Sequence, residues 1–171
     1  VWDFGANTGF FSRLASNKKI AAVSFDNDHA AVEKNYREMR AKKESYLLPL
    51  VIDITNPSPS LGWGNQERMT FLERGPCDTA LVLALFHHLA ISNNLPFESI
   101  AAFFASLCNS LIIEFVPKKD SNVKRLLVAR KDIFSGYTRA AFEEAFEKYF
   151  VIKEIASVGD SQRLLYCMVK R

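Results

Sequence analysis

The fold is decided by the stretch Val1-Trp2-Asp3-Phe4-Gly5-Ala6-Asn7-Thr8-Gly9-Phe10-Phe11-Ser12. It combines the end of an apolar strand, a turn that contains two glycines, and the first residues of a helix. Glycine lets the backbone bend sharply and approach a ligand closely, and the N–H groups at the start of a helix favour a carboxylate or a phosphate. The stretch therefore predicts a loop that binds a nucleotide-like ligand.

The spacing of the glycines separates the known nucleotide-binding motifs. A dinucleotide fingerprint requires G-x-G-x-x-G, but Asn7 stands where the second glycine should be, and no P-loop ending in Gly-Lys-Ser/Thr is present. The spacing Asp3-x-Gly5-x-x-x-Gly9 instead resembles motif I of the class I S-adenosylmethionine-dependent methyltransferases. The resemblance implies that Gly5, Ala6, Asn7 and Gly9 pass under the methionine part of the cofactor, with Asp3 at its ammonium group. The alternative is an ordinary glycine turn between a strand and a helix.

The composition predicts one globular domain. A chain of 171 residues can bury a substantial core, and 49% apolar with 24% charged residues is the ordinary balance for such a domain. No apolar run is long enough to cross a bilayer, so no membrane partner is expected, and a net charge of +3 is too small to indicate nucleic acid. Val1 stands inside a predicted strand, so we expect residues 1–171 to form one methyltransferase domain whose N-terminus is truncated.

The spacing of the three cysteines indicates the redox state of the cellular compartment. Cys77, Cys108 and Cys167 have no metal-like spacing and lie in or beside apolar runs. We therefore expect buried, reduced thiols in a cytoplasmic protein.

Strand-like and helix-like patterns alternate along the rest of the chain. Apolar runs predict strands at 20–25, 46–54, 77–89, 111–116, 150–156 and 164–169. Helical spacing predicts helices from Ser12 onward and at about 30–42, 96–107 and 139–149, while residues 118–131 have no settled form. The alternation predicts a doubly wound α/β three-layer sandwich. The resemblance implies a mostly parallel seven-stranded sheet in the order 3-2-1-4-5-7-6, with the last strand antiparallel.

Carboxylates stand at the ends of the second and third predicted strands, at the edge where ligands bind in such sheets. Asp26 can accept two hydrogen bonds from ribose hydroxyls, and the resemblance implies that role. Asp28 could reach the same ligand, but a helix N-cap is favoured. The resemblance implies that Asp53 accepts from the adenine amine while Ile54 packs on the ring. The alternative for Asp53 is a turn-stabilising residue before Asn56-Pro57.

The segment Phe86-His87-His88-Leu89 is predicted to end the fourth strand, where the resemblance places the transferable methyl group. Side chains of consecutive strand residues point oppositely, so one histidine at most faces the site unless the chain has already turned. A neutral imidazole of His87 or His88 could accept a proton from an attacking hydroxyl or hold it in line, and the alternative is a structural role for both. No third His or Cys has usable spacing, so no metal is expected.

Charged residues lie in and after the fifth predicted strand, and their role has two interpretations. Glu114 lies inside an apolar strand and needs a partner, for which Lys118, Arg125 and Arg130 are candidates. The surrounding cations could meet an anionic substrate or form a solvated face; they are Lys118, Lys119, Lys124, Arg125, Arg130 and Lys131. No aromatic residues interleave them as in a single-strand nucleic-acid platform.

The predicted function is methyl transfer from S-adenosylmethionine by in-line displacement. Methyltransferases that act on amino groups of bases or of glutamine often carry Asn/Asp-Pro-Pro-Tyr/Phe after the fourth strand, and its absence here disfavours amide-type N-methylation. His87 or His88 could position or deprotonate the acceptor, so an oxygen of a small molecule is favoured. RNA and protein acceptors stay open, as do a nicotinamide-dependent oxidoreductase and a non-catalytic cofactor-binding module. Residues 114–118 and 132–134 also resemble bacterial methyltransferase-like proteins of the nodulation type.

Overall fold

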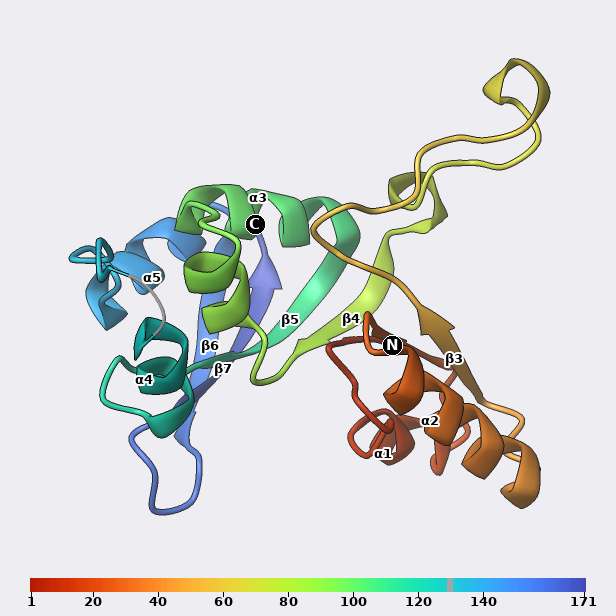
Figure 1. Cartoon of the computed structure of the whole chain (residues 1–171), viewed down its shortest axis with the longest axis horizontal. Coiled ribbons are helices and arrows are strands. Elements are labelled where there is room, and N and C mark those ends of the chain that lie inside the picture. Colours follow the sequence, from red (N-terminus) through yellow and green to blue (C-terminus); the bar gives the residue numbers. More distant parts are fainter. Residues whose placement is uncertain (129–130) are drawn as a thin grey trace. The chain divides into compact units, whose positions relative to one another are not determined.

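The computed structural model describes residues 1–128 and 131–171. These residues form a seven-stranded sheet in the order β3-β2-β1-β4-β5-β7-β6 (Figure 1). β1, β2 and β3 are parallel, whereas β7 is antiparallel to both β5 and β6. The predicted α/β class, the strand order and the antiparallel seventh strand are thus confirmed. The strands are β1 (Trp2–Phe4), β2 (Ala22–Asp26), β3 (Leu47–Val51), β4 (Cys77–Val82), β5 (Cys108–Phe115), β6 (Phe150–Ser157) and β7 (Leu164–Lys170).

Helices connect most of the strands, as expected for a doubly wound sheet. The α-helices are α1 (Ser12–Ser16), α2 (His29–Lys42), α3 (Phe97–Leu107), α4 (Ser121–Val128) and α5 (Arg139–Glu147). Three shorter helical segments are η1 (Trp63–Asn65), η2 (Leu72–Arg74) and η3 (His88–Ser92). The chain divides into two compact units, residues 1–81 and 82–171, which are described in turn.

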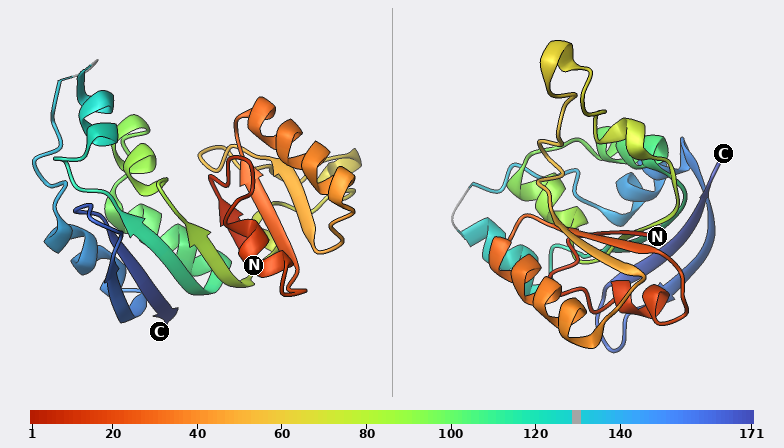
Figure 2. Two further views of the ribbon diagram at one scale, coloured as in Figure 1. Left: turned by 90° about the horizontal axis from the view of Figure 1, so that it is seen from below. Right: turned by 90° about the vertical axis from the view of Figure 1, so that its right-hand side faces the viewer.

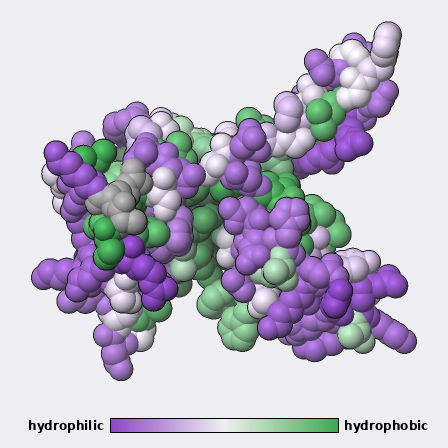
Figure 3. Space-filling model, viewed as in Figure 1, coloured by the Kyte–Doolittle hydropathy of each residue, from purple (hydrophilic) through white to green (hydrophobic). Residues whose placement is uncertain are grey.

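The first unit is built on an aromatic cluster beneath β1 and β2. The rings of Phe4 and Phe25 stack with centroids 5.2 Å apart, and Phe71 meets Phe25 edge-on at 5.5 Å. All three side chains are buried, so they supply much of the apolar area that stabilises this unit. α2 packs on β2 and β3, and its outer surface is hydrophilic (Figure 3).

A long connection between β3 and β4 departs from the sequence-based expectation. The predicted strand to residue 54 ends at Val51, because Asp53 turns the chain by accepting hydrogen bonds from Thr55. The following arm is drawn in yellow in Figure 1. It is closed by a bridge between Leu61 and Arg68, and Trp63 near its tip is 90% exposed.

The second unit packs α3 against α5 beside the β5-β7-β6 strands (Figure 2). Its core is aromatic, with Phe86, Phe142 and Phe146 fully buried and Phe86 4.9 Å from Phe142. Thr138 is the N-cap of α5, because its hydroxyl accepts from Ala141 N. Residues 118–131 contain α4, and Ala129 and Arg130 lie outside the described residues.

Two predicted strand boundaries in the second unit are wrong. The strand predicted at 77–89 ends at Val82, and the chain is helical by Phe86. Ala84, at the turn, has a φ of 49° and donates its N–H to the Glu114 carboxylate. A side chain distant in sequence therefore ends the strand, although the apolar residues continue. The strand predicted from residue 111 begins at Cys108, directly after α3.

Candidate functional site

The loop between β1 and α1 is a tight turn held against β2. The N–H groups of Gly5 and Ala6 both donate to the Phe25 carbonyl, at 2.9 and 3.0 Å. Gly5, Asn7 and Gly9 have φ values of 71°, 50° and 77°, a left-handed backbone that glycine adopts readily and asparagine tolerates. The sequence Gly-x-Asn-x-Gly therefore suits the turn at each of these three positions.

Gly9 has a second reason to lack a side chain. A Cβ atom placed there would lie 2.4 Å from Asn35 Nδ2 and 2.6 Å from Asn35 Oδ1. Asn35 is buried on α2 and donates to the Ser24 hydroxyl at 3.0 Å. The amide consequently fixes the distance between the loop, α2 and β2. Asn35 was not predicted from the sequence, although a polar residue among the apolar positions on one face of α2 is a signal that indicates it.

Asp26 joins the end of β2 to the glycine loop. Its Oδ2 accepts from Asn7 N at 2.7 Å, and its Oδ1 accepts from Asp28 N at 2.9 Å. A carboxylate has about four acceptor sites, so two remain for a ligand. Asp28 is the N-cap of α2, accepting from the N–H groups of Ala30 and Ala31, which confirms the favoured interpretation of that residue.

Asp3 is the buried acid of the loop. It is 2% exposed, and its Oδ2 accepts from the Ser12 hydroxyl at 2.6 Å. Burial raises its pKa to about 6, and the nearby Asp26 charge adds to the rise, while hydrogen bonds from Ser12 partly oppose it. A cationic group beside Asp3 would favour the ionised form.

Asp53 and Ile54 follow β3 rather than ending it. Asp53 Oδ1 accepts from both the N–H and the hydroxyl of Thr55, at 2.8 and 2.7 Å, so the predicted alternative of a turn-stabilising residue is present. The segment lies beside the end of β2, because Ile52 N donates to the Asp26 carbonyl at 2.9 Å. The adenine contact of Asp53 and Ile54 stays a prediction.

His87 and His88 lie in a helical turn after β4, with ring centroids 4.3 Å apart. His87 is 0% exposed, and neither ring nitrogen has a hydrogen-bond partner among residues 1–128 and 131–171. Burial lowers its pKa to about 4, and His88 and Arg163 lower it further than the Asp120 charge raises it. His88 is exposed, and partial desolvation lowers its pKa as well. Both imidazoles are therefore neutral at pH 7.

Glu114 corrects the predicted ion pairing. Its Oε1 lies 3.2 Å from the Arg163 guanidinium, and its Oε2 accepts from Ala84 N at 2.6 Å. Lys118 pairs instead with Asp132 at 2.9 Å, Arg125 is exposed, and Arg130 lies outside the described residues. Arg163 comes from the hairpin between β6 and β7, and its spacing from Glu114 gives no sequence signal.

A cavity of about 460 Å³ lies within the second unit. Its walls include the rings of Phe97, Phe134 and Tyr137, with Ala141 and Ala145 leaving space on α5. Charged groups at the cavity are Glu98, Glu144 and Lys148, of which Lys148 and Glu98 pair at 2.7 Å. Its size and mainly apolar walls suit a small organic molecule.

Comparison with known proteins bears on the fold and the family. No model of a protein family matches the chain. The chain is 41% identical to the nodulation protein NoeA of Rhizobium meliloti strain 1021 over 168 residues. That match covers 97% of this chain and 35% of the relative, so the chain spans about a third of that protein.

Two solved structures share the architecture. The magnesium protoporphyrin IX methyltransferase of Synechocystis PCC 6803, crystallised with SAH, matches with a TM-score of 0.65 and 18% identity, over 99% of this chain and 73% of that one. An rRNA methylase from Escherichia coli matches with a TM-score of 0.65 and 16% identity, over 100% and 57%. The chain has the class I methyltransferase fold.

The residues of the glycine motif lie where the strands of this fold end. Asp3, Gly5 and Gly9 stand at the end of β1 and in the turn after it, and Asp26 ends β2. Among the described residues, no helix has the length and apolarity that crossing a membrane requires, and no group of three His, Cys, Asp or Glu is placed to hold a metal.

Proposed function

We propose that this chain binds S-adenosylmethionine and transfers its methyl group to an oxygen of a small molecule. The observation that carries the proposal is the hydrogen bond from Asn7 N to Asp26 in a chain with this fold. It joins the glycine turn after β1 to the acid at the end of β2. A glycine turn without the G-x-G-x-x-G spacing, beside a carboxylate with acceptor sites to spare, suits an adenosyl ligand better than a pyrophosphate.

The residues of the first unit fit the cofactor chemically. Asp3 is a buried acid whose raised pKa would fall on pairing with the ammonium group. Asp26 would accept from the ribose hydroxyls, with Asp53 and Ile54 at the adenine. Gly5, Ala6, Asn7 and Gly9 would contact the methionine part through the backbone. On this proposal residues 1–171 act as one cofactor-binding domain.

When bound, S-adenosylmethionine supplies an electrophilic methyl group on a positively charged sulfur. The chain's residues then need to hold the nucleophile in line and exclude water. His88 is exposed and neutral at pH 7, so we assign it the contact with the acceptor hydroxyl, from which it can accept a proton. His87 packs against it and would set its orientation.

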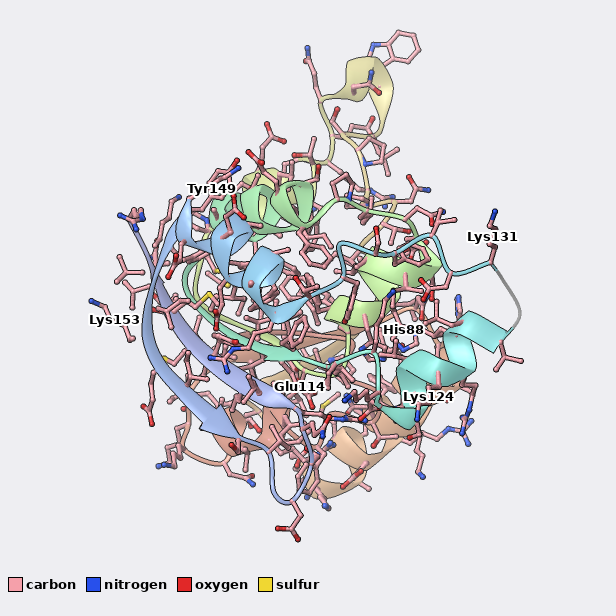
Figure 4. All side chains as sticks on the ribbon, turned by 90° about the vertical axis from the view of Figure 1, so that its left-hand side faces the viewer. His88, Glu114, Lys124, Lys131, Tyr149 and Lys153 are labelled. Carbon is pink, nitrogen blue, oxygen red and sulfur yellow. The ribbon has the colours of Figure 1, made fainter. Side chains whose placement is uncertain are left out.

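The cavity of the second unit favours a small acceptor. Its aromatic walls can hold an apolar ring or chain, and its charged groups can contact polar substituents. The second candidate is RNA. It is favoured by two exposed cations of α4, Lys124, which is labelled in Figure 4, and Arg125, and by the named substrate of the E. coli structure. The three cysteines are free thiols, with Cys77 and Cys108 buried and Cys167 half-buried rather than buried as expected. Free thiols suit a reducing compartment, so we propose a cytoplasmic site of action.

The proposal is tested first by calorimetry with S-adenosylhomocysteine and with NAD. We expect the first to bind and the second not to bind; the reverse would favour an oxidoreductase. The protein is then incubated with methyl-labelled cofactor and bacterial extract that is untreated, nuclease-treated or protease-treated. Label in a small-molecule fraction that survives both treatments supports the proposal, and label lost with nuclease identifies RNA. Binding without transfer to any fraction would show a non-catalytic module.

A further inference from the structure

We propose that Arg163, in the hairpin between β6 and β7, is a positioning residue for the turn that carries His87 and His88. The catalytic meaning of this inference rests on the proposed function, whereas the contacts that support it do not. Nothing in the local sequence around the histidines points to this arginine, which is 49 residues from Glu114 in sequence.

The guanidinium of Arg163 holds two acids at once. Its Nε and Nη2 donate to the two oxygens of Asp120, at 2.8 and 3.1 Å, a bidentate geometry that fixes the plane of the group. Its Nη1 donates to Glu114 Oε1 at 3.2 Å. Glu114 is 6% exposed, so removing the arginine would leave a nearly buried carboxylate without its cation.

Glu114 connects Arg163 to the segment after β4. Its second oxygen accepts from Ala84 N at 2.6 Å, where the backbone has a φ of 49°. A non-glycine residue in this region is strained and persists only where its surroundings hold it. The carboxylate therefore fixes the turn that leads, within three residues, to His87. Figure 4 shows Glu114 on β5 and His88 on the helical segment.

Asp120 extends the same network to α4. It also accepts from Asn122 N at 2.8 Å, at the start of that helix. η3 packs against α3 and α4, so the network supports the histidines from two directions. The charged and titratable groups that act on His87 are His88, Arg163 and Asp120, and the arginine opposes protonation of the imidazole. Because Arg163 and Asp120 act on His87 through their charges, the His87 pKa reports whether this network keeps its place beside the histidines.

The experiment compares Arg163→Gln and Arg163→Lys with Arg139→Gln, a control that removes a partly exposed cation from the Arg139–Glu143 pair of the same unit. Ring C–H signals of His87 and His88 are followed by NMR as a function of pH. We expect the His87 pKa to rise by roughly half a unit or more in Arg163→Gln, to return partly in Arg163→Lys, and to stay unchanged in Arg139→Gln. Identical His87 titrations in Arg163→Gln and the wild type would overturn the proposal.

Turnover is the second measurement. In Arg163→Gln we expect about a tenfold loss of kcat, with S-adenosylhomocysteine affinity unchanged because its proposed residues lie in the first unit. If Arg163→Gln does not fold, Asp120→Asn replaces it, since it weakens the Arg163 contact and keeps the side-chain shape. The Asp120 charge raises the His87 pKa, so we expect that pKa to fall in Asp120→Asn, and an unchanged titration would overturn the proposal. A wild-type protein without methyl transfer would refute the proposed function, while the NMR titration would still decide the role of Arg163.

Discussion

The two units hold their candidate site residues in different ways. In the first unit, Asp26 accepts from two backbone N–H groups, those of Asn7, 19 residues away, and of Asp28, two residues away. In the second unit, the turn is fixed over longer separations, because the Ala84 N–H donates to Glu114, 30 residues away, and Glu114 pairs with Arg163, 49 residues away. Contacts between a glycine loop and the end of the next strand follow from a short motif, whereas contacts with a more distant acid and arginine do not.

The units also differ in the pH dependence of their buried titratable groups. The pKa of Asp3 is raised to about 6, so its contribution to folding is most favourable at acid pH and declines as the pH rises through about 6. The pKa of His87 is lowered to about 4, so its contribution is present above pH 6.5 and is lost as the pH falls toward 4. The two groups therefore give opposite slopes of stability against pH.

The largest effect is expected from Gly9→Val. The new side chain would collide with buried Asn35 in a left-handed backbone, so we expect a loss of about 3–5 kcal/mol in unfolding free energy and at least a hundredfold loss of S-adenosylhomocysteine affinity. Urea unfolding and calorimetry measure both. Gly159→Val is the control, because it places the same side chain at a similar φ of 54° with open space around it. Equal losses in the two variants would show that backbone strain, and not the collision, explains the effect.

His87→Leu is expected to flatten the acid side of the stability curve. A shift from 6.5 to about 4 corresponds to about 3 kcal/mol of stability lost between those pH values, and leucine has no proton to bind. Leucine also removes two buried nitrogens without hydrogen bonds, so stability at pH 7 should not fall. Urea midpoints at pH 7 and pH 4.5 test this. An unchanged difference between the two midpoints would show that His87 does not titrate in this range.

The sequence predicted much of the site in the first unit and less of the site in the second unit, because the contacts that hold the second site join residues far apart in the chain. Asp3, Gly5, Gly9 and Asp26 stand at the strand ends and turn that the glycine motif indicates, and the parallel strands bring Asp26 to the loop. The turn at Ala84 could not be predicted, since the run from Ala80 to Phe86 is continuously apolar and the contact that ends the strand comes from Glu114. Periodicity records which residues are buried, not which distant acid accepts a backbone N–H.

Asp3→Asn separates stability from binding in the first unit. Removing a buried charge whose pKa is near 6 should raise the unfolding free energy at pH 7 by about 2 kcal/mol, with some of the gain lost through the weaker Ser12 hydrogen bond. The affinity of the Asp3→Asn variant for S-adenosylhomocysteine should fall about tenfold, because the ligand's ammonium group no longer has a carboxylate beside it. In the wild type the same affinity should decline below pH 6. Thermal unfolding and calorimetry at pH 5.5 and 7.5 measure these effects, and a pH-independent affinity would exclude Asp3 from the cofactor contact.

Substitutions at the helix N-caps are expected to have the smallest effects on stability, and the two caps form a closely matched pair of variants. Asp28 accepts from two N–H groups of α2, and Thr138 accepts from one of α5, so Asp28→Ala and Thr138→Ala should each cost about 1 kcal/mol, the former slightly more. Only the first cap lies next to a proposed cofactor contact, because Asp28 N donates to Asp26. Asp28→Ala should therefore also weaken S-adenosylhomocysteine binding a few fold, while Thr138→Ala leaves it unchanged. If both caps weakened binding equally, loss of global stability would explain the effect, and the backbone contacts around Asp26 would not be what organises the first site.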